Sequence, residues 1–104
     1  QVCESADRPD AIFCANDALA LGVIDAARDS GLSVPGDLSV VGFDDIDAAA
    51  EHDPPLTTVR VFKEQLGETG LRVLSDLIGE KPSRFDQGSA TTTVAPQLVV
   101  RGTS

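Results

Sequence analysis
The 104-residue sequence contains no methionine, tryptophan or tyrosine, and four phenylalanines are its only aromatic residues. It has no apolar run of the roughly 18 residues that a membrane helix requires, so we expect no membrane segment. No basic stretch followed by an apolar one stands near the first residue, so no signal peptide is expected. Because the sequence starts at Gln1 and lacks methionine, we expect it to be part of a longer protein.

Basic residues are scarce. Eight lysines and arginines stand against 17 aspartates and glutamates, for a formal net charge of −9. DNA-binding surfaces neutralise phosphates with lysine and arginine, so this chain is not expected to bind DNA by itself. Its 41% hydrophobic and 24% charged residues are ordinary for one globular domain, which leaves small-molecule and protein partners open.

Metal-binding and nucleophilic residues are also few. The only cysteines are Cys3 and Cys14, and the only histidine is His52. Two thiols without further ligands do not make a zinc site, so we expect no metal and no cofactor. A disulfide is possible by count, although the apolar surroundings of Cys14 are typical of a small buried residue. Acidic neighbours on both sides of His52 indicate an exposed loop.

The first half of the chain predicts a strand, a helix and a second strand. Residues 11–15 and 38–43 are short apolar runs, as in strands of a parallel sheet that are buried on both faces. Between them, residues 17–30 have helical periodicity, with Asn16 as N-cap and Gly31 just beyond the C-terminus. The joints are short, so a right-handed βαβ unit is expected. The apolar face of the helix comprises Ala20, Val23, Ile24 and Ala27.

The second half contains one further helical pattern. Residues 62–79 place an apolar stripe on one side, and Leu71 lies off that stripe. We interpret the stripe mainly as core, with a partner interface as the alternative, and contact on two faces is possible because of Leu71. The stripe comprises Phe62, Leu66, Val73, Leu74, Leu77 and Ile78.

The remaining segments are less regular. Residues 44–56 are polar and irregular, and the short run 57–59 is β-prone. Residues 83–90 are loop-like, and 91–100 are β-rich but interrupted by Pro96, which favours an edge strand or a bend there. The last four residues are expected to form a tail.

Polar side chains follow both predicted strands of the βαβ unit. Asn16 and Asp17 come after the first strand, and Asp44 and Asp45 come after the second. Ligands of open parallel sheets bind beyond the carboxyl ends of the strands, and amides and carboxylates there suit hydroxyl-rich ligands such as sugars. Capping of the helix and ordinary turn formation are the alternatives for these residues. An aspartate pair could also serve acid–base or magnesium chemistry, but no other catalytic pattern accompanies it, so we do not expect an enzyme.

Taken together, the segments resemble the LacI/GalR family of bacterial transcription regulators over nearly the whole chain. The resemblance rests on several motifs in one order and spacing. These are PDAIFCAND (9–17), ALG (20–22), GL (31–32), VP (34–35), DLSVVGFDD (37–45), PPLTTV (54–59) and PQLVVR (96–101).

The resemblance implies an α/β fold, namely a partial parallel-sheet, periplasmic-binding-protein-like type I fold. It assigns residues 1–60 and 91–104 to the C-terminal subdomain of an effector-binding domain. Residues 61–80 would be a helix of the N-terminal subdomain, with 81–90 as a connecting loop. The DNA-binding headpiece would be absent from this chain, so DNA would be bound only through that N-terminal headpiece.

The resemblance also implies an effector site and a dimer. Asn16 and Asp44 match family positions that contact the effector, and Asp17 joins them from its place after the strand. Lys63, like Val61, follows the Thr-Thr pair at positions that can face the cleft. The expected dimer interface comprises Leu19, Leu21, Val23, Ala49, Glu51 and His52.

The function implied is a cytoplasmic, dimeric repressor or activator whose small effector, a sugar or sugar derivative, modulates operator binding. The alternative is a secreted sugar-binding protein of a transport system, which shares the fold. A helix-turn-helix or a signal peptide upstream would distinguish the two. An enzyme is a third hypothesis, and turnover of a ligand by the full-length protein would support it.

Overall fold
The computed structural model describes residues 7–79 and 91–104 of the chain. The chain is divided into two compact units. One unit contains the residues up to Val61 together with Gln97–Ser104, and the other is Phe62–Pro96. The boundaries between the two units fall at 61/62 and 96/97. The predicted boundaries between the subdomains are 60/61 and 90/91. The expected loop at 83–90 lies outside the described residues, and so does Cys3.

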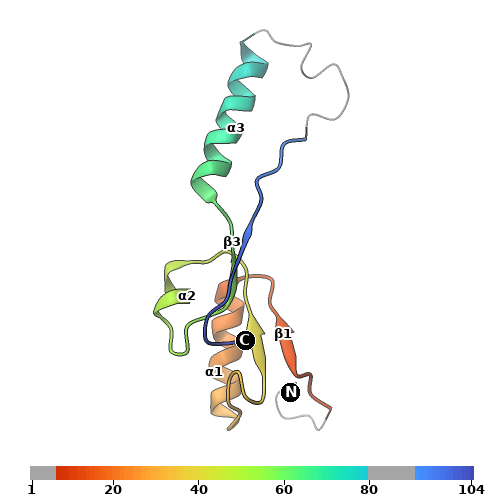
Figure 1. Cartoon of the computed structure of the whole chain (residues 1–104), viewed down its shortest axis with the longest axis vertical. Coiled ribbons are helices and arrows are strands. Elements are labelled where there is room, and N and C mark those ends of the chain that lie inside the picture. Colours follow the sequence, from red (N-terminus) through yellow and green to blue (C-terminus); the bar gives the residue numbers. More distant parts are fainter. Residues whose placement is uncertain (1–6, 80–90) are drawn as a thin grey trace. The chain divides into compact units, whose positions relative to one another are not determined.

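Within the described residues, short strands and helices alternate along the chain (Figure 1). In order they are β1 (Ala11–Phe13), α1 (Asp17–Asp29), β2 (Ser39–Val41), α2 (Asp47–Glu51), β3 (Thr58–Arg60), α3 (Lys63–Ile78) and β4 (Gln97–Val99). Strands β1 and β2 pair in parallel with Ile12 opposite Val40, as the predicted βαβ unit requires. Strands β3 and β4 pair antiparallel, with Val59 opposite Leu98. An isolated parallel bridge from Val41 to Thr57 connects β2 to the residue before β3.

Helix α1 has the ends that its sequence predicts. Asn16 caps the first turn, and Gly31 has a φ of 82°, which a glycine adopts without steric cost. The N–H groups of Gly31 and Leu32 donate to the carbonyls of Arg28 and Ala27, at 3.0 and 2.9 Å. These two bonds form a Schellman motif and satisfy carbonyls that the helix leaves open.

The core of the first unit lies between α1 and the strands. The helix contributes its predicted face, in which Ala20, Ile24 and Ala27 are buried and Val23 packs against them. Cys14 is buried and not disulfide-bonded, as a small apolar residue would be. The buried apolar set is Cys14, Ala20, Ile24, Ala27, Leu38, Val40, Ala49 and Leu56.

Two expectations about burial are wrong for this chain. Strand β1 is not covered on both faces, because Ala11 is exposed and Phe13 is 69% exposed. Among the described strands β1 pairs only with β2, so it lies at an edge. The apolar stripe of α3 is not covered by the described part of this chain either, since no residue of that helix is buried. The other described residues of its unit, 91–96, form no helix or strand that would cover the stripe.

Two further local predictions need correction. Residues 44–56 are not wholly irregular, because α2 forms within them. The last four residues are not a tail. Thr103 is fully buried, and its hydroxyl donates to the Val40 carbonyl at 2.7 Å and accepts from the N–H of Thr57 at 2.8 Å. This side chain fills the space between β2 and the residue before β3, which no local sequence pattern reveals. Pro96, as expected, directly precedes the edge strand β4.

Candidate functional site
Asn16 lies between the end of β1 and the start of α1. Its backbone is extended, with φ −156° and ψ 171°, and its Oδ1 accepts a 2.9 Å hydrogen bond from the N–H of Leu19. The side chain is partly exposed. Asn16 is therefore the N-cap of α1, as the sequence predicts, and its amide oxygen makes the capping hydrogen bond.

Asp17 is placed differently from the sequence expectation. Its side chain is fully buried, and both carboxylate oxygens bind protein groups. Oδ1 accepts a hydrogen bond from the hydroxyl of Thr58 at 2.6 Å, and Oδ2 accepts one from the N–H of Ile46 at 2.9 Å. The positive end of the α1 dipole adds to this stabilisation of the negative charge. Asp17 is thus an internal anchor that joins α1, β3 and the loop after β2, and we remove it from the candidate ligand contacts.

Gly42 makes this anchor possible. A Cβ atom at that position would lie 2.2 Å from Asp17 Oδ1 and 2.9 Å from Leu56 Cδ2. Only glycine lets the backbone pass so close to the carboxylate. The main chain is also tied down on both sides of this point, because the N–H of Asp17 donates to the Phe43 carbonyl and that of Gly42 donates to the Thr57 carbonyl.

Asp44 and Asp45 follow in an unusual backbone conformation. Their φ angles are 121° and 58°, in a region that residues with a Cβ rarely adopt. The N–H of Asp44 donates to the Val59 carbonyl at 2.9 Å, and Asp44 forms an isolated parallel bridge with Arg60. The loop is therefore held by β3 in a conformation that costs energy, and such strain is concentrated at functional sites.

Asp45 forms ion pairs with two arginines. Its Oδ2 accepts from Arg60 Nε at 2.7 Å, and its Oδ1 accepts from Arg101 Nη1 at 2.8 Å. Burial acts to raise the pKa of this carboxyl, but the hydrogen bonds and charges of Arg101 and Arg60 outweigh it. The net effect holds the pKa of Asp45 below its ordinary value of 3.8. Neither arginine is singled out by a sequence pattern, although adjacent aspartates in a chain with so few cations indicate a need for counter-charges.

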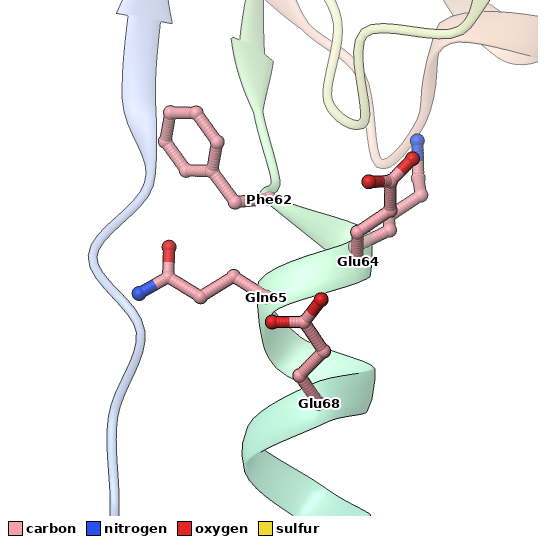
Figure 2. Close-up of a pocket in the computed structure, with 5 residues that line it drawn as sticks. Phe62, Glu64, Gln65 and Glu68 are labelled. Atoms are coloured by element: carbon pink, nitrogen blue, oxygen red, sulfur yellow. The ribbon is translucent and has the colours of Figure 1, made fainter.

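Lys63 stands at the first position of α3, in the second unit. With Phe62, Glu64, Gln65 and Glu68 it lines a shallow hollow of about 450 Å³. Figure 2 shows Phe62 and Gln65 projecting on one side of the helix start and Glu64 on the other. The hollow has amide, carboxylate and ammonium groups together with one aromatic ring, which suits a small polar ligand with an apolar face.

The residues expected at a dimer interface differ in accessibility. Leu19 is 56% exposed and Glu51 is exposed, whereas Leu21 and Val23 are partly buried against the core. Ala49 is the fully buried residue of α2, so its side chain is not available to a partner. We therefore omit Ala49 from the proposed contact surface and retain the other five.

His52 is not in an exposed loop, which corrects the sequence expectation. It caps the C-terminus of α2, and its N–H donates to the Ala48 carbonyl. The ring is only partly exposed, with Nδ1 3.0 Å from the Pro54 carbonyl oxygen and Nε2 3.2 Å from Asp25 Oδ1. The ring thus connects α1 to the turn after α2. This local packing role could not be inferred from its acidic neighbours.

Two absences hold for residues 7–79 and 91–104. No group of three or more histidine, cysteine, aspartate or glutamate residues there is arranged to hold a metal ion. No helix in the same part of the chain is long and apolar enough to cross a membrane.

Comparison with known proteins identifies the family to which these features belong. The family described as periplasmic binding protein-like domain matches residues 1–104. Among curated proteins, the chain is 42% identical over 95 residues to the HTH-type transcriptional repressor PurR of Mannheimia succiniciproducens. It is 47% identical over 94 residues to the HTH-type transcriptional regulator MalR of Streptomyces coelicolor. These matches cover 91% and 90% of this chain but 27% and 26% of the relatives, so the chain spans about a quarter of their length.

Solved structures agree with this assignment. A LacI family transcriptional regulator from Lactobacillus casei with bound sucrose has a TM-score of 0.82 and 30% identity, covering 100% of this chain and 37% of that one. The lac repressor dimer bound to operator and the anti-inducer ONPF has a TM-score of 0.80 and 36% identity, covering 92% and 32%. These proteins are regulators rather than enzymes. The chain belongs to the periplasmic binding protein-like domain family and matches part of the effector-binding domain of LacI/GalR-type transcription regulators.

Proposed function
We propose that this chain forms one wall of the effector cleft of a LacI-type transcription regulator, and that the effector is a sugar or a sugar derivative. One observation supports this above the others. The backbone of Asp44 is held at a φ of 121° beyond the carboxyl end of β2, next to the start of α1, where Asn16 lies. Such strain persists only where surrounding contacts impose it, and here β3 and the anchor at Asp17 supply those contacts.

The chemistry of the two residues suits a neutral, hydroxylated ligand. The carboxylate of Asp44 accepts hydrogen bonds from hydroxyl groups, and the amide nitrogen of Asn16 donates them while Oδ1 caps α1. Lys63 is a further proposed contact, from the second unit. The sucrose-bound regulator from Lactobacillus casei has the same fold over this chain, and this likeness supports a sugar as the class of effector.

The wider function is part of the same proposal. DNA would be bound by a helix-turn-helix headpiece outside this chain, in keeping with the net charge of −9 and the HTH-type names of the curated relatives. The effector would change operator affinity by shifting the population of the regulator's conformations.

Calorimetric titration of the full-length protein tests the effector site. Sucrose and glucose are the first probes, followed by a panel of other mono- and disaccharides. Asp44→Ala should weaken binding of the responding sugar by ~10-fold or more, because a hydrogen bond to a charged group is lost. Asp37→Ala is the matched control, since Asp37 is exposed and its carboxylate accepts hydrogen bonds from Ser33 within its own turn. Unchanged affinity in Asp44→Ala would remove that residue from the site, and no response to any sugar would refute the sugar class.

The proposed dimer has a separate test. Leu19 is a large apolar side chain that is 56% exposed on α1, so Leu19→Glu places a charge on the proposed contact surface. Sedimentation of the full-length protein should show a wild-type dimer, a Leu19→Glu variant shifted toward monomer, and an Asp44→Ala variant that remains dimeric. A Leu19→Glu variant that dimerises as the wild type does would place the interface elsewhere.

A further inference from the structure
The two units are connected by the chain segments that contain β3 and β4. The chain leaves the first unit after Val61, directly following β3, and it re-enters at Gln97, the first residue of β4. The two strands pair antiparallel over three residues each, and they lie side by side in Figure 1. We call the segments 58–61 and 97–101 the two crossings. These crossings are where the chain passes between the two units.

One carboxylate binds an arginine from each crossing. Asp45 uses Oδ2 for Arg60 Nε at 2.7 Å and Oδ1 for Arg101 Nη1 at 2.8 Å. Arg60 is the last residue of β3, and Arg101 ends the returning crossing. The Asp45 and Arg101 side chains are only 10% and 16% exposed, so solvent screens their interaction weakly. Hydrogen bonds between ionised groups are roughly twice as strong as neutral ones.

Arg101 is itself fixed, which makes the cluster stiff. Its Nη1 also donates to the Leu56 carbonyl at 3.1 Å, and its N–H donates to the Thr57 hydroxyl at 2.8 Å. On the other side, Asp45 is the neighbour of Asp44, whose N–H binds the Val59 carbonyl within the outgoing crossing. The loop that carries Asp44 is therefore tied to both crossings, and a movement of that loop is transmitted to each of them.

We infer that Asp45 is a positioning residue that couples the effector loop at Asp44 to both crossings through Arg60 and Arg101. This inference rests on the proposed function for the role of Asp44. It adds a regulatory step to it, in which contact with Asp44 alters the crossings through the carboxylate of Asp45. Asp45 itself points to the arginines and needs no contact with the effector.

Hydrogen exchange of the full-length protein, followed by mass spectrometry, tests the coupling without any effector. In Asp45→Asn we expect the amides of the two crossings to exchange ~10-fold faster or more, because the charge-assisted bonds that hold them are lost. Exchange in α1 should be unchanged. Asp37→Asn is the matched control, because it removes a hydrogen-bonded aspartate charge of the same unit far along the chain from both crossings.

The pattern of exchange separates positioning from a general structural role. A residue that only supports the fold would accelerate exchange in α1 as much as in the crossings, and this outcome would overturn the inference. Unchanged exchange in the crossings would overturn it as well. If Asp45→Asn does not fold, Arg60→Gln provides the same test more gently, since Arg60 is 41% exposed.

Addition of sucrose or glucose distinguishes the inference from the proposed function. Where one of these sugars binds, it should slow exchange in the crossings of the wild type and have much less effect there in Asp45→Asn. The affinity of Asp45→Asn for the sugar should differ from that of the wild type by less than ~3-fold. Equal slowing in both proteins would refute the coupling. If neither sugar binds, that part of the proposed function is in question, and the exchange of the sugar-free proteins still decides whether Asp45 holds the crossings.

Discussion
The backbone of Gly42 lies directly against the buried carboxylate of Asp17. A methyl group in place of the glycine hydrogen would lie 2.2 Å from Oδ1, well inside contact distance. The glycine and the aspartate come from different segments, the end of β2 and the start of α1, and each depends on the other. Asp17 can reach Thr58 and Ile46 only because Gly42 leaves space for it.

Gly42→Ala should therefore destabilise the protein by about 1–3 kcal/mol, the usual cost of forcing an extra methyl into a packed interior. The unfolding midpoint of the full-length protein in urea measures this. Gly67→Ala is the control, because Gly67 lies in α3 and a Cβ there would meet nothing within 4 Å. That variant should be neutral or gain about 0.5–1 kcal/mol from helix propensity. Equal effects of the two substitutions would contradict the close approach at Gly42.

The hydrogen bond from Thr58 to Asp17 leads to a second stability prediction. Thr58→Val keeps the shape of the side chain but leaves a buried carboxylate oxygen without its 2.6 Å donor, at a cost of about 1–3 kcal/mol. The double variant Asp17→Asn/Thr58→Val should lose clearly less stability than the sum of the two single variants, since both remove the same interaction. Thermal unfolding of all four proteins gives the comparison. Strict additivity would mean that the bond contributes nothing.

Local structure was the part of this molecule that the sequence predicted well. The span of α1, its cap at Asn16 and its end at Gly31 follow from periodicity and from the conformational preferences of single residues. The parallel pairing of β1 and β2 follows from the strand–helix–strand order. These features depend on neighbours within a few positions, which is the range over which a sequence pattern carries information.

Burial and partner choice were predicted poorly, for a physical reason. A carboxylate does not specify which donor it binds, and Asp17 and Thr58 are separated by 41 positions while Thr103 and Val40 are separated by 63. The sequence therefore predicts a ligand contact at Asp17 and a tail at the last four residues, whereas Asp17 and Thr103 are both buried. Strand β1 and helix α3 have apolar patterns that indicate burial, but the surface that covers such a pattern is chosen by the whole fold and not by the pattern.

The ion pairs of Asp45 predict a dependence of stability on pH. Its pKa in the folded protein lies below the ordinary value of 3.8, so its contribution is fully present above that value and is lost as the pH falls through the lowered pKa. Asp45→Asn should thus lower the melting temperature at pH 6–7, and the difference from wild type should disappear as the pH falls below about 3.8. Melting curves of both proteins between pH 7 and 3 measure it. A difference that stays constant with pH would show that the charge of Asp45 is not the stabilising feature.

Burial makes the single described cysteine a probe of the core. Removal from water raises the pKa of the Cys14 thiol above its ordinary value, and only the thiolate is reactive. In the folded full-length protein at pH 8, the Cys14 thiol should therefore react slowly with a thiol reagent. In denaturant the same thiol should react at once. That slow thiol should be missing from Cys14→Ser. If the number of slow thiols is the same in both proteins, Cys14 is accessible in solution.

Asn16 offers a way to separate capping from ligand contact. Serine is also a good N-cap, so Asn16→Ser should keep the stability of α1, whereas Asn16→Ala should lose about 1 kcal/mol with the bond to the Leu19 N–H. Only asparagine combines that cap with an amide nitrogen able to donate to a sugar hydroxyl. Both variants should therefore bind the responding sugar ~10-fold or more weakly than wild type, although their melting temperatures differ. If Asn16→Ser binds the sugar as tightly as wild type, Asn16 is a helix cap and nothing more, and the proposed site retains Asp44 and Lys63 without it.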